Sequence, residues 1–391
     1  MQLLTGWLIL LLSVMGHTEL WVIAVNRLHA LHIRAALLRK FRTVHDVAVL
    51  GYPFGLLWFA GFSETSLLRG GRPVEQSRSL LWLLLVTMTG CIPLLCGIIR
   101  WQFIRRPQFL QQDVGERIDV ASATRFDPAS NDIRGPRRHP SQLWPLNEVY
   151  WLDVNTKSVR TTRANGTAPD RPLRIVHFSD LHLIGCPGGD YYRFMIRKAE
   201  AFNADVYVFT GDLIDRVELL STAVEILSPL TKLAPCYFVL GNHDWRFDHS
   251  QIREQLEASG WKCVAGTADI VTLRGRRVLF AGSELPWMGK APPAIGVSKC
   301  DLNVLISHSP DQHPFAGRSG YDLMLAGHTH GGQVVLPLVG PVYSPSLFGV
   351  SFVSGLFRMG PLTVHVTRGV GAKDPLRWNC CPELTCLEVY C

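Results

Sequence analysis

The sequence predicts a membrane-embedded helical region followed by an α/β domain. Three observations lead to this fold class. The first hundred residues contain apolar runs of the length that helices need to cross a bilayer. Beyond residue 147, short apolar runs alternate with helical stretches, which is the pattern of βαβ units. Residues with metal-ligand chemistry directly follow several of these runs, where ligands bind in open α/β sheets.

Composition separates the two regions. Hydrophobic residues make up 47% of the 391 residues and charged residues 18%, which is apolar for a soluble enzyme. The net charge of +7 belongs to residues 1–106, which hold 11 Lys and Arg against 4 Asp and Glu, while the rest of the chain holds 28 of each sign. A domain without a basic excess is not expected to bind long nucleic acids. The ten cysteines have no regular spacing, so nothing requires an oxidising compartment.

Residues 1–106 predict a transmembrane region of about three helices. Residues 3–25 are apolar apart from His17 and Glu19, and no basic residue precedes them as in a cleaved signal peptide. Residues 80–99 are uncharged and rich in Leu, which makes them the strongest candidate. Residues 47–62 lie near the short limit for spanning. The alternative for each run is a buried core helix.

Basic residues in the loops predict the orientation of this region. The loop between the first two runs carries five basic residues before its first acidic one, and three arginines follow the third run. Three spans would place residues 26–45 and everything after residue 100 in the cytoplasm. If residues 47–62 do not span, the same rule places the C-terminal part outside. We expect a multi-pass integral membrane protein whose C-terminal domain is cytoplasmic.

The rest of the chain predicts a linker and a domain. Residues 107–146 are polar and without a period, which is typical of a linker. Residues 147–391 form the expected α/β domain, with helical stretches near 190–203 and 217–233. Its candidate strands, buried on both faces, are residues 173–178, 205–209, 235–240, 278–281, 302–306 and 322–326.

Candidate metal ligands and a candidate acid follow the ends of these apolar runs. In chain order they are Asp180, His182, Asp212, Asn242, His243, His308, His328 and His330. The carboxyl ends of strands open onto one crevice, so we expect these side chains to converge. Gly211, Gly241 and Gly327 each precede one of them and permit a tight turn.

The chemistry of this set indicates two divalent metal ions. Carboxylate, imidazole and amide ligands suit manganese, which we expect, or iron or zinc, better than calcium or magnesium. Asp212 can bridge two ions about 3.5–4 Å apart, the separation found in two-metal hydrolases. Two cations lower the pKa of a bridging water towards about 7, and the resulting hydroxide can attack phosphorus. His243, with Asp244 beside it, fits the acid that protonates the leaving oxygen.

Five motifs occur in a fixed order: Asp-x-His, Gly-Asp-x-x-Asp, Gly-Asn-His-Asp, a lone His and Gly-His-x-His. Over residues 172–390 this order resembles the calcineurin-like metallophosphoesterase superfamily. The resemblance implies a four-layer α/β/β/α sandwich with a dinuclear centre and with His243 as the acid, assisted by Asp244. The ligands implied for the first metal are Asp180, His182, Asp212 and His330. Those implied for the second metal are Asp212, Asn242, His308 and His328.

The sequences around the first and last motifs are similar to a membrane-anchored, bacterial-type branch. Some members hydrolyse phosphodiesters, and others cleave the pyrophosphate of UDP-2,3-diacylglucosamine in lipid A synthesis. We therefore expect a phosphorylated, lipid-linked nucleotide at the bilayer surface as substrate. The alternatives are a general phosphodiesterase or nuclease, and a metal-binding membrane scaffold without catalysis. The scaffold would lack a ligand or the acid, and none is missing here.

Three features beside the motifs have two interpretations each. Trp245 and Arg246 follow the expected acid and either contact substrate or pack the loop. Asp215, the second acid of Gly-Asp-x-x-Asp, is expected to cap the next helix or support the site. Residues 334–357 are apolar for a stretch beside a metal site. They form a groove for acyl chains, a lip that contacts the membrane, or closing strands of the sandwich.

Overall fold

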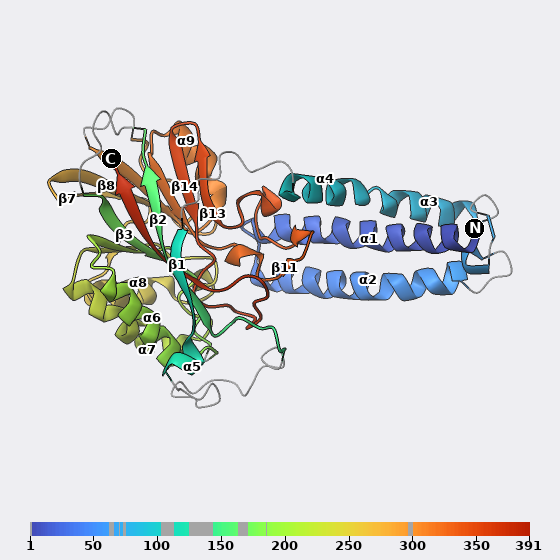
Figure 1. The fold of residues 1–391 in the computed structure, drawn as a ribbon, viewed down its shortest axis with the longest axis horizontal. Coiled ribbons are helices and arrows are strands. Elements are labelled where there is room, and N and C mark those ends of the chain that lie inside the picture. The colour runs from blue at the N-terminus through green and yellow to red at the C-terminus, as the bar shows by residue number, and fades with distance from the viewer. Residues whose placement is uncertain are drawn as a thin grey trace. The chain divides into compact units, whose positions relative to one another are not determined.

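The structure is a computed structural model that describes residues 2–61, 66–69, 71–72, 76–102, 113–124, 144–162, 171–184, 186–295 and 300–391. The chain forms two compact units, whose elements are labelled in Figure 1. The first comprises Met1–Arg105 with Pro337–Gly340, and the second comprises Arg106–Leu336 with Pro341–Cys391. The linker expected at 107–146 lies outside the described residues except for 113–124 and 144–146. Of these, residues 113–119 form a strand.

Apolar helices build the first unit. They are α1 (Gln2–His29), α2 (Ala35–Gly61), α3 (Arg78–Met88) and α4 (Cys91–Gln102). The stretch expected as one helix at 80–99 is divided at residues 89 and 90. A Cβ added at Gly90 would stand 2.0 Å from the carbonyl oxygen of Gly16 on α1. Small residues allow such close approach between apolar helices.

Two stretches of this unit have the length and hydropathy of membrane spans. They are Leu3–His29 and Arg78–Ile99, with mean hydropathies of 1.9 and 2.2. The run expected at 47–62 corresponds to the C-terminal part of helix α2. The helix begins at Ala35 and includes the basic residues at 39–42. Among the described helices, α2 therefore falls short of the hydropathy of the other two.

Two mixed sheets form the centre of the second unit. The seven-stranded sheet has the order β1-β2-β15-β3-β4-β5-β6, and the six-stranded sheet has the order β13-β14-β10-β9-β8-β7. The first consists of β1 (Asp113–Asp119), β2 (Trp151–Arg160), β15 (Glu383–Tyr390), β3 (Leu173–Phe178), β4 (Val206–Phe209), β5 (Cys236–Phe238) and β6 (Lys262–Cys263). The second consists of β13 (Gly355–Met359), β14 (Leu362–Val366), β10 (Leu323–Ala326), β9 (Leu302–Ser307), β8 (Arg276–Ser283) and β7 (Ala268–Leu273).

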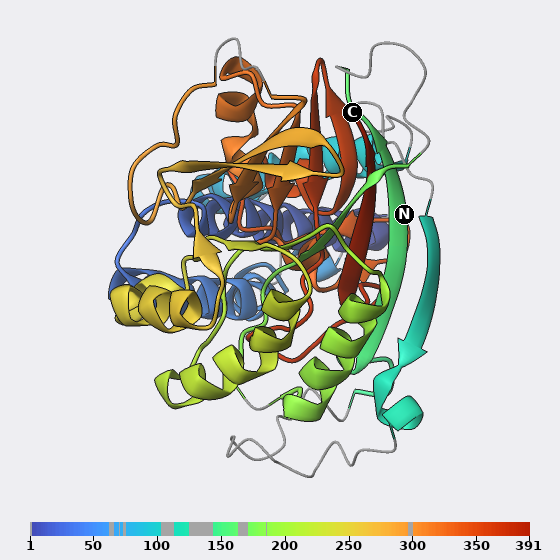
Figure 2. The same cartoon turned by 90° about the vertical axis from the view of Figure 1, so that its left-hand side faces the viewer.

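Helices cover the outer face of each sheet. They are α5 (Val120–Thr124), α6 (Gly189–Ala201), α7 (Leu220–Leu227), α8 (His249–Ala258) and α9 (His313–Arg318). Helices α6, α7 and α8 pack on the seven-stranded sheet and lie side by side in Figures 1 and 2, while α9 packs on the six-stranded sheet. Between the sheets lies an aliphatic core that includes Ile175, Val208, Val304 and Leu325. These four layers confirm the expected α/β/β/α sandwich.

Parallel pairing brings the carboxyl ends of the central strands to one edge. Strands β3 to β6 are parallel in the first sheet, and β8, β9, β10 and β14 are parallel in the second. All six predicted strands are present, with ends that differ by at most two residues from those expected. The loops that carry the candidate ligands therefore open at the same edge.

The apolar stretch at 334–357 is only in small part a closing strand. It contains the short strands β11 (Val335–Leu336) and β12 (Gly340–Pro341), which pair with each other, and a 3-10 turn at Gly349–Phe352. Only the residues from Gly355 onward join the six-stranded sheet, as β13. Leu347 and Phe348 are exposed to solvent.

Candidate metal centre

Five of the expected ligands lie in left-handed backbone. Their φ angles are 57° at Asp180, 46° at His182, 58° at Asp212, 72° at His328 and 51° at His330. A non-glycine residue in this region costs on the order of 1–3 kcal/mol and persists where the surrounding structure holds it. Each of these residues follows the end of β3, β4 or β10 by two to four residues. The strained turns aim the side chains into the space beyond the sheet edge.

Close approach of the loops requires glycine at three positions. A Cβ at Gly241 would stand 2.1 Å from Oδ1 of Asp212, and a Cβ at Gly327 would stand 2.1 Å from Oγ of Ser179. At the third expected position, Gly211, the φ angle is 97°. A Cβ at Gly211 would also stand 2.6 Å from the backbone nitrogen of Gly241, so glycine leaves room for a neighbouring ligand loop at all three positions and serves the left-handed turn itself at Gly211.

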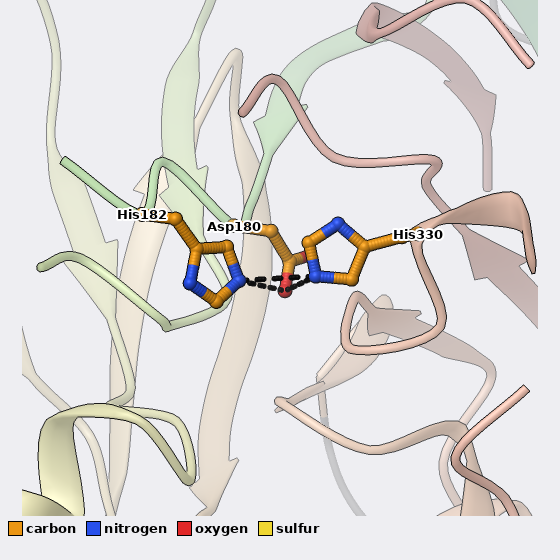
Figure 3. A group of neighbouring side chains, drawn as sticks. All are labelled: Asp180, His182 and His330. Atoms are coloured by element: carbon orange, nitrogen blue, oxygen red, sulfur yellow. Dashed lines mark hydrogen bonds and ion pairs between the residues drawn. The ribbon is translucent and has the colours of Figure 1, made fainter. Parts of the chain in front are cut away.

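The first group of converging side chains consists of Asp180, His182 and His330 (Figure 3). The Nε2 atoms of the two histidines lie 3.0 Å apart. Oδ1 of Asp180 lies 3.8 Å from Nε2 of His182 and 3.6 Å from Nε2 of His330. Three ligand atoms from two different sheets thus surround one point.

The second group consists of Asp212, His308 and His328. Nε2 of His308 lies 3.3 Å from Oδ2 of Asp212 and 3.1 Å from Nδ1 of His328. The amide oxygen of Asn242 lies 3.1 Å from Nε2 of His308. The four residues expected to bind the second metal therefore lie together.

Asp212 stands between the two groups. Its Oδ2 lies 3.4 Å from Nε2 of His182 in the first group, close to its distance from His308 in the second. Burial raises the pKa of this carboxyl, but the neighbouring His308 and His243 lower it, and the balance leaves it well below its ordinary value. Asp212 is therefore an ionised carboxylate in the position of a bridge.

The residues present fit divalent cations. At two places a pair of imidazole nitrogens meets at 3.0 or 3.1 Å beside buried carboxylates. Lone pairs and negative charge converging in this way repel one another unless a cation or protons lie between them. Mixed nitrogen and carboxylate ligands suit first-row transition ions. In each group the ligand atoms lie within 4.8 Å of one another, which is a spacing that one ion can span.

The comparisons with known proteins agree with this geometry. The model of the family described as calcineurin-like phosphoesterase matches residues 173–332. The chain is 34% identical over 234 residues to phosphodiesterase YaeI of Escherichia coli (strain K12), a match that covers 56% of this chain and 82% of YaeI. The chain belongs to the calcineurin-like phosphoesterase family. It is accordingly a metal-dependent hydrolase of phosphate esters.

Two further relatives extend the comparison. This phosphoesterase is 28% identical over 227 residues to the uncharacterized metallophosphoesterase YkuE of Bacillus subtilis (strain 168), which covers 54% of this chain and 77% of YkuE. It is 28% identical over 239 residues to a transmembrane protein with metallophosphoesterase domain from Danio rerio, which covers 54% of this chain and 52% of the relative. With the two apolar stretches in the first unit, the latter likeness indicates association with a membrane.

Asp215 supports two histidines of the phosphoesterase site. Its Oδ2 lies 2.8 Å from Nδ1 of His182, and its Oδ1 lies 2.5 Å from Nδ1 of His243. Burial raises the pKa of Asp215, but His182 and His243 lower it well below its ordinary value. The carboxylate accepts an N–H from both rings and so leaves each Nε2 directed at the site, as in carboxylate–histidine–metal triads. Of the two roles expected for Asp215, these contacts agree with support of the site and not with capping of a helix.

Asp244 does not assist His243, which corrects the sequence-based assignment. Its carboxylate is fully buried and accepts the backbone N–H groups of Asp212, Leu213 and Gly241, each at 2.9 Å. Burial and the nearby charge of Asp212 raise its pKa to about 7. Asp244 therefore links the loops of Asp212 and Gly241 through their backbone N–H groups. The residue that contacts the imidazole of His243 is Asp215.

The two residues after Asp244 separate into packing and exposed positions. Trp245 is half-buried and packs against the core beneath the helices of the seven-stranded sheet. Arg246 is exposed, and its Nη1 lies 3.4 Å from Nδ1 of His243. Of the two, Arg246 is the one that lies beside the His243 ring, and a contact with substrate stays a prediction for both.

Trp287 and Thr210 were missed in the sequence. The Trp287 ring is buried, with its centroid 4.8 Å from that of His328 and 5.6 Å from that of His308. The carbonyl oxygen of Thr210 accepts the Nδ1 hydrogen of His308 at 2.7 Å. A backbone carbonyl leaves no mark in a sequence, and Trp287 lies outside every motif. The Gly-Asp motif would have indicated Thr210 only through its place directly before Gly211.

Proposed function

We propose that this phosphoesterase is anchored in a membrane and hydrolyses a phosphodiester or pyrophosphate bond of a lipid-linked nucleotide. The observation that carries the hydrolytic part is Asp212, which lies within 3.4 Å of a histidine from each ligand group. Asp180, His182, Asp212 and His330 would hold one cation, and Asp212, Asn242, His308 and His328 the other. Two divalent cations supply Lewis acidity and a nucleophilic hydroxide at neutral pH. Manganese is the metal we propose.

His243 would protonate the leaving oxygen. Its Nδ1 hydrogen is held by Asp215 at 2.5 Å, so Nε2 is the atom that donates. Burial lowers the pKa of His243 to about 4, and a phosphate anion beside the ring raises it. A bound phosphate therefore favours the protonated ring. The attacking water gives one proton to solvent and its oxygen forms a bond to phosphorus, while the bond from phosphorus to the leaving oxygen breaks. The leaving oxygen takes the His243 proton, which a proton from solvent then replaces.

The apolar surface after the last ligand motif supports a lipid-linked substrate. Leu347 and Phe348 are 46% and 41% exposed. The carboxylate of Asp311 accepts hydrogen bonds from Oγ of Ser346 at 2.5 Å and from the backbone N–H of Leu347 at 2.9 Å, which fixes the loop. Phe348 also packs on His313, with ring centroids 4.5 Å apart. A fixed apolar surface beside a hydrolytic site fits acyl chains, and UDP-2,3-diacylglucosamine is the substrate we propose.

One assay separates this substrate from its rivals. Full-length protein in detergent, loaded with Mn²⁺, would be given UDP-2,3-diacylglucosamine, the same nucleotide sugar without acyl chains, and a soluble aryl phosphodiester. We expect the first to be turned over with the highest kcat/KM. Good activity on the aryl diester without activity on the acylated nucleotide would exclude the lipid-linked substrate. It would favour a general phosphodiesterase, which the likeness to phosphodiesterase YaeI supports.

We further propose three spans, formed by α1, by the C-terminal half of α2, and by α3 with α4, with the phosphoesterase domain in the cytoplasm. The basic residues at 39–42 lie near the start of α2 and would face the cytoplasm, in keeping with the positive-inside rule. Reporter fusions at the C-terminus would test this orientation. Activity of a periplasmic reporter in place of a cytoplasmic one would contradict it.

A further inference from the structure

Arg377 lies outside every motif and outside the residues that the family model matches, yet it is one of the largest fully buried side chains of the described residues. Its Nη1 donates to the carbonyl oxygens of His330 and Arg368, both at 2.8 Å, and its Nη2 donates to the carbonyl oxygen of Gly371. Nη2 also lies 3.2 Å from Nδ1 of His330. One guanidinium group therefore joins the loop of a ligand histidine to the segment at 368–371.

The segment at 368–371 in turn holds Asp180. The backbone N–H of Val370 donates to the carbonyl oxygen of Ser179 at 2.9 Å, and that of Gly371 donates to the carbonyl oxygen of Asp180 at 2.8 Å. At Gly369, with a φ angle of 71°, a Cβ would stand 2.8 Å from Cβ of Asp180. Through this segment, Arg377 sets the position of Asp180 relative to His330, and both belong to the first ligand group.

The second ligand group is held by other residues. The carbonyl oxygen of Thr210 and the ring of Trp287 contact His308, and Asp244 binds the backbone N–H of Asp212. Among the described residues, the hydrogen bonds of the Arg377 guanidinium do not reach Asp212, His308 or His328. A change at Arg377 should therefore act on one ligand group and spare the other.

The environment of Arg377 argues against a purely stabilising role. Arg368, whose backbone carbonyl Arg377 contacts, forms ion pairs with Asp153 and Glu383. Among the ion pairs of the described residues, none involves Arg377. Burying a guanidinium without a carboxylate is costly even when carbonyl groups accept its hydrogens. We therefore attribute the buried charge of Arg377 to the carbonyl groups that its planar guanidinium holds in place.

We propose that Arg377 is a positioning residue that fixes the Asp180–His182–His330 group for its cation. This inference rests on the proposed two-metal site. Replacing a residue behind the ligands lowers metal affinity by about 10–100-fold. We expect Arg377→Met to weaken one of two Mn²⁺ sites by that factor and to leave the other unchanged, with Arg377→Lys intermediate because a single ammonium cannot reach all three carbonyls.

The test is an Mn²⁺ titration of the chelator-treated, full-length protein in detergent, followed by calorimetry and by the electron paramagnetic resonance signal of coupled Mn²⁺ pairs. Arg377→Met would lose the coupled signal at concentrations that fill both sites of the wild type. Arg276→Met is the control, since Arg276, half-buried on β8, also donates to a backbone carbonyl, that of Arg171, away from the ligand groups. It should titrate as the wild type does.

Two backgrounds decide where Arg377 acts. Asp180→Asn already weakens the first group, so adding Arg377→Met should change the remaining affinity by less than twofold. Asn242→Ala weakens the second group, and there the full effect of Arg377→Met should persist. An unchanged titration, or an equal loss in both backgrounds, would overturn the inference. If Arg377→Met does not fold, Arg377→Lys is judged by the same criteria. A wild type that binds fewer than two Mn²⁺ would instead refute the proposed function.

Discussion

The two ligand groups of the metal centre are supported in different ways. Behind Asp180, His182 and His330 stand charged groups, because Asp215 holds His182 and Arg377 holds His330. The rings of His308 and His328 are instead contacted by a backbone carbonyl and an indole ring, and the Asp244 carboxyl binds only backbone N–H groups beside Asp212. Removing one partner of a buried charged contact leaves the other unpaired, whereas trimming an aromatic ring leaves a cavity. The first group should therefore respond more sharply to single substitutions than the second.

The largest effect is expected at Asp212, the residue that lies close to both ligand groups. Asp212→Asn removes the carboxylate that lies 3.4 Å from His182 and 3.3 Å from His308. We expect kcat/KM to fall by at least about a thousandfold, the scale seen when an essential group is removed. Metal analysis should show loss of both ions. Retention of one tightly held ion would mean that Asp212 is not a bridge.

Asp215 and Asp244 sharpen the comparison because they are carboxylates of one size with different contacts. Asp215→Asn should lower kcat by about 10²–10⁴-fold, since His243 loses the group that orients its proton. Asp244→Asn should lower the free energy of unfolding by about 1–3 kcal/mol through weakened backbone hydrogen bonds, with a smaller effect on kcat. Steady-state kinetics and urea denaturation measure both quantities. The reverse ranking in kcat would restore Asp244 as the assistant of His243.

Trp287→Leu tests the aromatic side of the comparison. The smaller side chain should weaken the Mn²⁺ site of His308 and His328 by about tenfold, as other changes to the shell around a metal do, and leave the first group unaffected. Trp261→Leu is the control, since Trp261 is equally buried but packs under the helices against Phe178. It should lower stability without changing either affinity. A similar titration for both variants would remove Trp287 from the site.

The smallest effect is expected at the exposed apolar side chains of Leu347 and Phe348. The double substitution Leu347→Ser and Phe348→Ser should raise the KM for an acylated nucleotide several-fold, as expected for lost apolar contact. The KM for a soluble diester should not change. An equal change for both substrates would show that the loop shapes the site itself and does not bind acyl chains.

The sequence predicts the part of this fold whose strands are apolar on both faces. Runs such as 173–178 and 302–306 consist mostly of aliphatic residues, with single buried polar residues at His177 and Asn303, so they are recognisable as buried strands. Strands β2 and β15 were missed because they bury polar groups. Lys157 on β2 and Glu383 on β15 form an ion pair at 2.5 Å and are both about 2% exposed. A buried charged pair hides the alternation that a strand prediction needs.

The residues of the candidate site also differ in how well the sequence predicts them. Its ligands were predictable because each stands within a few residues of a strand end, and so local sequence fixes them. The contacts behind the ligands depend on distant segments. Asp215 meets His243 across 28 residues, and Arg377 meets His330 across 47. Asp244 was misassigned because adjacency along the chain was taken for adjacency in space, whereas its carboxylate turns toward backbone amides below the site.

The left-handed turns at the ligands set stability and activity against each other. At Asp180, His182 and the other three residues, glycine would relieve a backbone that aspartate and histidine adopt at a cost. A selection for heat resistance alone would therefore favour glycine at these five positions and would yield robust proteins that no longer hydrolyse anything. Attempts to stabilise this phosphoesterase by directed evolution should screen for turnover in every round and take their gains from elsewhere in the chain.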